Sequence, residues 1–356
     1  MADFYNNNSF IINFIGINAI MALSIYITLS CAMLTLSNAA SMAIGAYTAS
    51  LLTMNAGWPL LPAVVAGAAF SSAVALVLGL AIGRLRGVFL AIATIGFSEV
   101  VRIILVNLDV VGGSEGLRLN TGNVTINVGF WEIYGTLAFF AFFFSRLKGS
   151  KMGLALEAIR EDESAARTMA INVTFYKVTA YVIGAAIAAT GGALYAHLRQ
   201  FISPADFGFS QAVQILLFAV IGGTFAWRGA IIGAFVVTIL PDVIRVMPLL
   251  GGIDVKNQPE IFTGLVLLAV ILFLPNGLLT ASLGINLKRR VARPRVESPG
   301  SDTWLPEGSA EDPQASKEVE TLLDPVAARA KAASTGEMQH DEATNGAGPG
   351  LTEEEK

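Results

Sequence analysis

Charged side chains inside apolar stretches are the residues of this sequence whose types and spacing suggest chemistry. Glu99 and Arg102 stand three residues apart, as do Asp242 and Arg245, so each pair shares one face of a predicted helix. A charge at the centre of a bilayer costs roughly 2.5–3.5 kcal/mol on insertion scales, so its presence requires a reason. Each pair either lines or gates a pathway for a polar solute, or orients helices as a self-satisfied ion pair.

A second group of charges lies between Lys151 and Lys177, the longest charged stretch before the C-terminal region. Residues recur there at intervals of three and four, which predicts a short amphipathic helix between two apolar segments. Such a loop is either a solvated connector whose charges fix the topology or a docking element for another protein. One face carries Leu156, Ile159, Glu163, Ala166 and Ala170, and another carries Glu157, Arg160 and Glu161.

Other residue types give no sign of catalysis or metal binding. Cys31 is the only cysteine, which excludes an intramolecular disulfide. His197 and His340 are far apart and have no cysteine nearby, so we expect a packed thiol and solvated imidazoles. No basic patch lies among aromatic residues, so nucleic acid is not an expected partner. The sequence lacks Gly-x-x-x-x-Gly-Lys-Ser/Thr, so we expect no ATP site or other cofactor in this chain.

The composition identifies the elements that hold these charges as membrane helices. Of the 356 residues, 54% are hydrophobic and only 14% are charged, against about 25% in soluble domains. The first 287 residues carry 14 Lys and Arg and 13 Asp and Glu, whereas the last 69 carry 9 and 14. A soluble globular protein is therefore excluded. We predict a transmembrane domain at 1–287, then a basic juxtamembrane run and a disordered acidic tail at 288–356.

The fold class predicted from these segments is all-α, a polytopic helical bundle of eight or nine spans. Each span needs about 20 apolar residues, and 38–54 is polar enough to be a broken or re-entrant helix. Even numbers of spans separate the basic loops, which places the N-terminus outside and the C-terminus in the cytoplasm. The expected spans are 10–36, 38–54, 60–83, 88–107, 130–147, 174–198, 211–226, 229–247 and 260–280.

The charged loop also carries a recognisable run of residues, Gly153-Leu154-Ala155, Ala158-Ile159-Arg160-Glu161-Asp162-Glu163, Ala165-Ala166 and Ile171-Asn172-Val173-Thr174. This run resembles the cytoplasmic coupling loop of LivM-type permeases, which are membrane subunits of bacterial ABC importers for branched-chain amino acids. The similarity extends in family order from about Thr35 to Leu279. Two departures stand out. Ala170 replaces a usual glycine, so we expect the helix to continue there without a sharp exit. The stretch 36–42 lacks the family's Gly-rich, His-containing pattern.

The resemblance implies a permease of the bacterial inner membrane that works with several partners. These are two ABC ATPase subunits, a second permease subunit and an extracytoplasmic substrate-binding protein, with ATP bound by the partner subunits. The ATPases would dock on a coupling loop at 148–175, with Glu161, Asp162 and Glu163 at the contact. Asp206, on the predicted outer face, either meets the binding protein or is a solvated acid. The residues assigned to the coupling loop are Glu157, Arg160, Glu161, Asp162, Glu163, Ala166 and Asn172.

Alternative functions remain open at this level. One is an ion-coupled secondary transporter that uses Glu99 or Asp242 as its coupling site, and another is a membrane scaffold without transport. The loop 151–177 favours the importer, because an ion-coupled carrier has no need of an ATPase-docking helix. Permeases that resemble this one also serve urea, amides or aromatic acids, and no residue here separates these substrates. In each case we expect a transport or structural subunit and not an enzyme.

Overall fold

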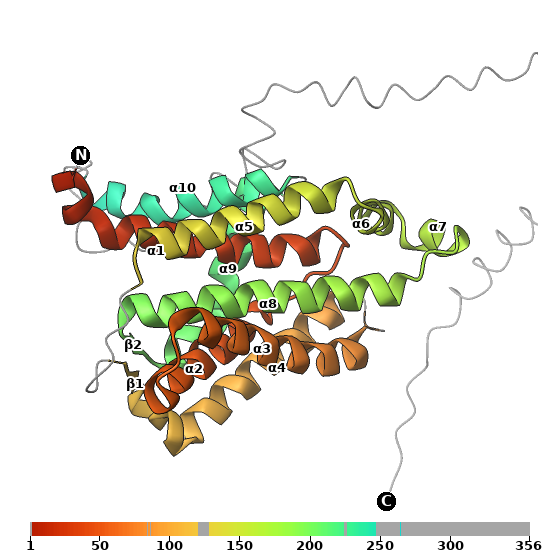
Figure 1. Cartoon of the computed structure of the whole chain (residues 1–356). Helices are drawn as coiled ribbons and strands as arrows, with labels where there is room; N and C mark the ends of the chain where they lie inside the picture. The colour runs from red at the N-terminus through yellow and green to blue at the C-terminus, as the bar shows by residue number, and fades with distance from the viewer. Residues whose placement is uncertain are drawn as a thin grey trace, which may run out of the picture. The chain divides into compact units, whose positions relative to one another are not determined.

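A computed structural model describes residues 2–83, 85, 87–119, 128–223, 226–246 and 264, without the side chains of 2–8 and 242–246. These residues belong to one compact, largely helical unit (Figure 1). The longer helices are α1 (Ala2–Leu29), α2 (Asn38–Ala56), α3 (Leu60–Ile82), α4 (Val88–Asn107), α5 (Phe130–Lys148), α8 (Val173–Arg199), α9 (Phe209–Gly222) and α10 (Trp227–Val246). The shorter elements are η1 (Asp109–Val111), η2 (Gly113–Glu115), β1 (Leu117–Arg118), α6 (Lys151–Glu161), α7 (Glu163–Thr168), β2 (Phe201–Ile202) and η3 (Pro204–Phe207).

The helices occur where the sequence predicts them, with one clear error at the end of the first span. Helix α1 ends at Leu29, and the link 30–37 is not helical, although 10–36 was expected to be one span. Of the alternatives for 38–54, a broken helix is also wrong, because α2 is continuous and the break precedes it, whereas a re-entrant helix stays a prediction. The ninth span at 260–280, apart from the helical Gly264, and the tail at 288–356 lie outside the described residues.

Hydroxyl groups that bond to the backbone gather toward the end of α1. Ser24, Thr28 and Ser30 each donate their hydroxyl to the backbone carbonyl three residues earlier, which competes with the helical hydrogen bonds. Ala32 then adopts a left-handed conformation with φ of 56°. The link is held by α4, because the Leu36 amide donates to Thr94 at 3.1 Å and Ser98 donates to the Leu36 carbonyl at 3.0 Å.

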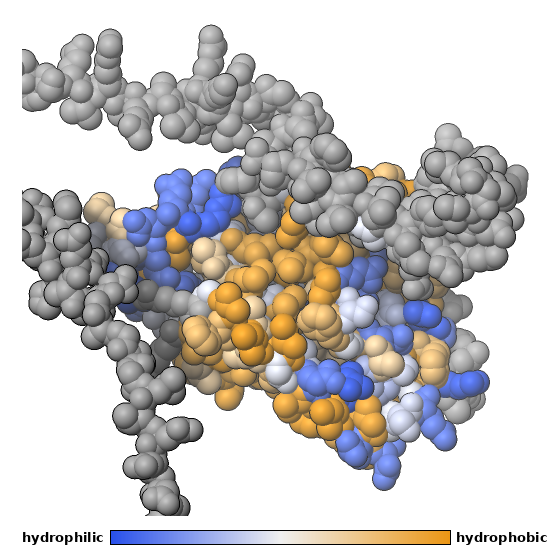
Figure 2. Space-filling view, turned by 180° about the vertical axis from the view of Figure 1, so that it is seen from behind, coloured by the Kyte–Doolittle hydropathy of each residue, from blue (hydrophilic) through white to orange (hydrophobic). Residues whose placement is uncertain are grey.

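Among the described residues, four helices are long and apolar enough to cross a membrane, and the pair α9 and α10, bent by 119°, makes a fifth if it counts as one span. The four are Ser9–Leu29 of α1, α3, α4 and α8. Figure 2 shows apolar side chains collected into a band between more polar ends, as expected of a surface in contact with lipid or another subunit. The described chain is therefore a helical membrane domain.

Glycines allow α2 and α8 to touch backbone to backbone at the centre of the bundle. A Cβ added to Gly45 would collide with the Ala189 backbone, and one added to Gly192 would collide with the Met42 carbonyl. Such small residues let membrane helices approach closely, where dispersion contacts and not the hydrophobic effect hold them together. Helices α1 and α3 also pack on α8, so α8 is the central helix of the described part.

The packing also fixes helix directions. Helix α2 runs parallel to α8, whereas α1 runs antiparallel to it, so α1 ends at the same end of the bundle where α6 and α7 lie (Figure 1). We call this the hairpin end. The opposite end, where β1 pairs with β2, is called the strap end, after the strap 200–208 that joins α8 to α9. The contacts that establish these directions are Ser37 with Tyr181, Thr53 with His197, Ser24 with Gly184 and Met21 with Gly191.

Candidate functional site

The candidate site is the α6–α7 hairpin, which the sequence presents as a single amphipathic helix. Its first helix begins at Ser150, whose hydroxyl accepts a hydrogen bond from the Gly153 amide at 3.2 Å. Gly153 lies directly against the end of α5, since an added Cβ would collide with the Leu147 carbonyl. The N-terminal turn of α6 is therefore fixed to α5 by backbone contact.

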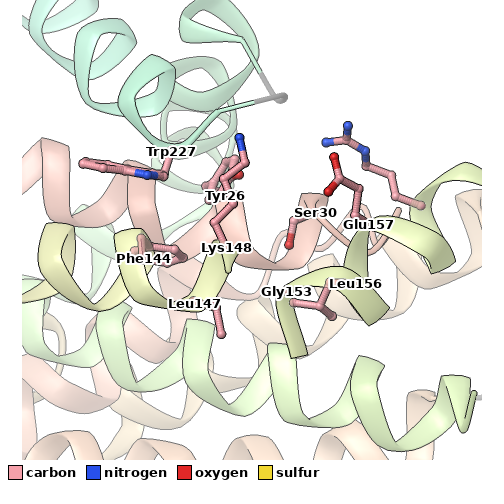
Figure 3. A pocket seen from close by; sticks show the side chains of 10 residues that line it. Tyr26, Ser30, Phe144, Leu147, Lys148, Gly153, Leu156, Glu157 and Trp227 are labelled. Atoms are coloured by element: carbon pink, nitrogen blue, oxygen red, sulfur yellow. The ribbon is translucent and has the colours of Figure 1, made fainter. Parts of the chain in front are cut away.

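The inner face of α6 borders one small cavity of about 50 Å³ together with residues from the ends of α1, α5 and α10 (Figure 3). Leu156 and Ile159 are 2% and 1% exposed, so the face predicted from the helical spacing is indeed buried. Glu157 and Arg160 border the same cavity. Helix α6 itself packs on α5 and α8, and the cavity separates it from the residues of α1 and α10. The remaining lining residues are Tyr26 from α1, Ser30 from the link that follows it, Phe144, Leu147 and Lys148 from α5, Gly153 from α6 and Trp227 from α10.

Asp162 breaks the expected single helix into two. Its φ of −154° and ψ of 112° are extended, and its carboxylate accepts hydrogen bonds from the Ser164 and Ala165 amides at 2.7 and 3.0 Å. Asp162 is thus the N-cap of α7. The prediction of one continuous helix is wrong because an acid that can cap a new helix stands at this position. The spacing rule still holds on the far side of the break, where Ala166 is buried.

Glu163 ties the hairpin to α8. Its carboxylate forms an ion pair at 2.8 Å with Lys177, whose side chain is only 7% exposed, and a second pair at 2.8 Å with Arg167. A buried ammonium requires such a partner, because desolvation of an unpaired charge is costly. Of the three acids predicted to meet a partner protein, Glu163 is thus largely committed inside the chain, Asp162 caps α7, and Glu161 is exposed.

The exit from the hairpin is sharp, contrary to the expectation drawn from Ala170. This residue has φ of 59°, and the Ile171 amide donates to the Ala166 carbonyl at 3.1 Å, closing the end of α7. Asn172 then begins α8, where its side chain accepts a hydrogen bond from the Phe175 amide at 3.1 Å. The tertiary contacts of α7 and α8 therefore override the preference of alanine for a right-handed conformation.

The outer surface of the hairpin offers both apolar and charged groups to a partner. Leu154 and Met169 are 60% and 77% exposed, so they are the large apolar side chains of the hairpin that a partner can reach. Glu157 and Glu161 are exposed beside them in the chain. Sequence reasoning missed Leu154 and Met169; their signal was an apolar residue off the buried i, i+3, i+4 face.

The predicted ion pair of Glu99 and Arg102 forms, on the surface of α4. Arg102 donates from Nε to Glu99 Oε1 at 2.8 Å and also contacts that oxygen through Nη2. The side chains are 43% and 32% exposed, so the pair does not line a channel inside the described chain. Asp242 and Arg245 both lie in α10, but their side chains are outside the description.

The remaining polar candidates have local roles. Asp206 accepts a hydrogen bond from the Ser203 amide at 3.0 Å and caps η3 within the strap. His197 is buried, not solvated as expected, because it faces α2 and its Nε2 lies 3.1 Å from the Thr53 hydroxyl. Cys31 is packed in the core, as predicted. Among the described residues, no three His, Cys, Asp or Glu side chains could hold a metal ion.

Comparison with known proteins shows which family this chain matches. Residues 7–275 match the family described as branched-chain amino acid transport system / permease component. The permease protein LivM of the high-affinity branched-chain amino acid transport system of Salmonella typhimurium is 29% identical over 304 residues, covering 76% of this chain and 67% of LivM. LivM of Escherichia coli K12 is equally similar.

LivH, another permease protein of the same Salmonella system, is 27% identical over 171 residues, or 48% of this chain and 52% of LivH. No solved structure matches this chain significantly. The resemblance to LivM-type permeases is thereby confirmed over most of the membrane domain. The chain therefore belongs to the family of permease components of branched-chain amino acid transport systems.

Proposed function

We propose that this chain is a transmembrane permease subunit of an ABC importer that moves branched-chain or other small amino acids across the bacterial inner membrane. The observation that carries the proposal is the α6–α7 hairpin. It is joined to α5 through Gly153, to α8 through Glu163 and Lys177, and to α1 and α10 around one cavity. A partner that pushed on this hairpin would therefore act directly on α5 and α8.

The partners follow from this role. Two ATPase subunits dock on the hairpins of two permeases, and they alone bind ATP, because this sequence has no phosphate-binding loop. A second permease completes the membrane unit. The existence of two different permease proteins, LivM and LivH, in one Salmonella system supports such a pair. An extracytoplasmic binding protein delivers the substrate. The chain itself carries no cofactor and catalyses no covalent reaction.

The topology that we propose has the hairpin end in the cytoplasm. The basic residues Arg146, Lys148 and Lys151 lie at or beside that end, as the positive-inside rule requires. The start of α1 lies at the strap end, so the N-terminus is outside. With α2, α5, α9 and α10 also crossing, and a ninth span at 260–280, the C-terminus is cytoplasmic. The tail at 288–356 lies outside the described residues, and we assign it no transport function.

The test is purification of the complex from its native membranes, followed by reconstitution into liposomes. We expect two ATPases and a second permease to accompany the chain, and radiolabelled leucine to enter only when ATP is supplied on the ATPase side. Uptake by the chain alone, driven by a proton or sodium gradient without ATP, would instead identify a secondary transporter. Competition by isoleucine and valine, with urea and amides as controls, defines the substrate class.

A further inference from the structure

The exposed ion pair on α4 is placed where lipid contact is unfavourable. Helix α4 qualifies as a membrane span over its whole length, Val88–Asn107. Glu99 is its twelfth residue, so at 1.5 Å per residue it lies about 16 Å from the start of a helix about 30 Å long. Charged side chains at such depth almost always face a protein interior or a water-filled path, and not acyl chains.

The pair also leaves hydrogen-bonding groups available to an outside partner. Both of its contacts involve the same carboxylate oxygen, Glu99 Oε1, which receives Nε and Nη2 of Arg102. Within the described residues, Glu99 Oε2 and Arg102 Nη1 have no hydrogen-bond partner. An acceptor and a donor thus stand side by side on an outward surface, complementary to a molecule that carries both an ammonium and a carboxylate group.

The surface around the pair is shaped to receive another helix. An outward stripe runs along α4. It consists of Phe89, Ile92, Gly96, Val100 and Ile103, and each of its four large apolar side chains is at least 50% exposed. Gly96 interrupts it next to the pair, and an added Cβ there would touch nothing within 4 Å. The stripe therefore has a notch, with the charges on one side and apolar side chains above and below.

From these observations we infer that the α4 stripe is the face that packs against the second permease subunit, and that Glu99 and Arg102 border the amino-acid path between the two. The inference rests on the proposed function, which supplies the second permease and the zwitterionic substrate. Its reason is electrostatic: a partner subunit and an aqueous path satisfy the outward charges, whereas hydrocarbon does not. The remaining polar contacts come from the partner and the passing substrate.

Site-specific photo-crosslinking of the intact complex tests the interface. A benzophenone side chain replaces Val100, which is 53% exposed in the stripe, or, as a control, Val77, which is 72% exposed on α3. We expect position 100 to form an adduct with the second permease, and position 77 to form lipid adducts. Adducts at 100 only with lipid, with a second copy of this chain, or with the chain's own segment 260–280 would overturn the inference.

A charge-neutral double variant tests the path. In Glu99→Gln/Arg102→Gln no lone charge remains, so a purely structural pair would be replaced without consequence. We expect the complex to assemble with unchanged thermal stability but to take up leucine at least tenfold more slowly. Wild-type uptake by the double variant would contradict the role in the path. If wild-type complex takes up no amino acid although position 100 crosslinks to a second permease, the proposed function fails and the interface stands.

Discussion

Ala170 holds a backbone conformation that suits glycine better than alanine. Its φ of 59° costs an L-residue with a Cβ roughly 1–2 kcal/mol relative to the right-handed region. Glycine has no such penalty, although its unfolded state gains entropy. We therefore predict that Ala170→Gly raises the free energy of unfolding by up to about 1 kcal/mol, measured as a higher thermal midpoint of the purified complex.

The matched control lies five residues earlier. Ala165 is an exposed residue within α7, where glycine costs about 1 kcal/mol in a helix interior, so Ala165→Gly should lower the midpoint. If the thermal midpoint rises in Ala170→Gly and falls in Ala165→Gly, the difference between the two positions isolates the effect of φ. If both substitutions shifted the midpoint in the same direction, the left-handed conformation of Ala170 would not be the native one.

The buried hydroxyl of Tyr47 carries a desolvation cost, which is a different effect on stability from the backbone strain of Ala170. Tyr47 is 2% exposed, its ring packs edge-on against Phe207 of the strap at 5.9 Å, and its hydroxyl has no hydrogen-bond partner in the described chain. An unsatisfied buried hydroxyl costs about 1–3 kcal/mol of desolvation. Tyr47→Phe should therefore keep or raise the thermal midpoint of the complex.

Tyr181→Phe provides the comparison for Tyr47. The Tyr181 hydroxyl donates to Ser37 at 2.7 Å, so its removal should lower stability by about 1 kcal/mol. Midpoints are again read on the assembled complex. A loss of stability in Tyr47→Phe as large as that in Tyr181→Phe would reveal a partner for the Tyr47 hydroxyl outside the described residues.

At the scale of elements, the attachment of α6 to α5 depends on one glycine. A methyl group at position 153 would overlap the Leu147 carbonyl, so Gly153→Ala must move α6 away from the end of α5. If the hairpin transmits ATPase movement, the expected result is uncoupling: ATP hydrolysis by the complex persists while leucine uptake falls at least tenfold. Both rates are measured in the same proteoliposomes.

Gly149→Ala is the control for that variant. Gly149 has an ordinary φ of −90°, and the nearest atom to an added Cβ is the Arg146 carbonyl at 4.0 Å. This change should leave both hydrolysis and uptake near wild-type levels. If Gly153→Ala also left uptake unchanged, close contact of α6 with α5 would be unnecessary for coupling.

The attachment of α7 to α8 depends on Glu163. Removing its charge leaves the Lys177 ammonium buried without an anionic partner, and breaking a buried pair in this way costs about 3–5 kcal/mol, less here because Glu163 is 23% exposed. Glu163→Gln should therefore lower the thermal midpoint clearly, whereas Glu161→Gln, at an exposed position, should not. Similar midpoints for the two variants would show that the 163–177 pair contributes little.

The positions of the elements could be predicted from apolar run length, whereas their interruptions could not. Span 88–107 was predicted with its observed ends because polar residues flank it. The stop at Leu29 was missed because the link 30–37 is as apolar as the helix before it, and only its hydroxyls mark the change. Asp162 was read as a surface acid, since capping and partner contact require the same residue type. The exposure of Glu99 depends on tertiary packing, which helical spacing alone does not contain.

At the scale of the whole molecule, the loops between the described helices α1 to α4 lie alternately at the hairpin end and the strap end (Figure 1). The link between α2 and α3, with Trp58 42% exposed, lies at the strap end because α2 runs parallel to α8 and ends there. Met169, 77% exposed, lies at the hairpin end. If the bundle crosses the membrane as we propose, these two sites lie on opposite sides, the first outside and the second in the cytoplasm.

Single cysteines introduced at these positions test that arrangement, and the native Cys31 need not be removed first. Burial raises the pKa of the Cys31 thiol to about 12, so at pH 7.5 the thiolate that reacts with maleimides is scarcely present, and the residue is also inaccessible. We predict that Trp58→Cys reacts with an impermeant maleimide only in right-side-out vesicles and Met169→Cys only in inside-out vesicles. Native protein should react in neither until it is unfolded. Labelling of both positions from one side would exclude the proposed topology, because an odd number of crossings must separate them.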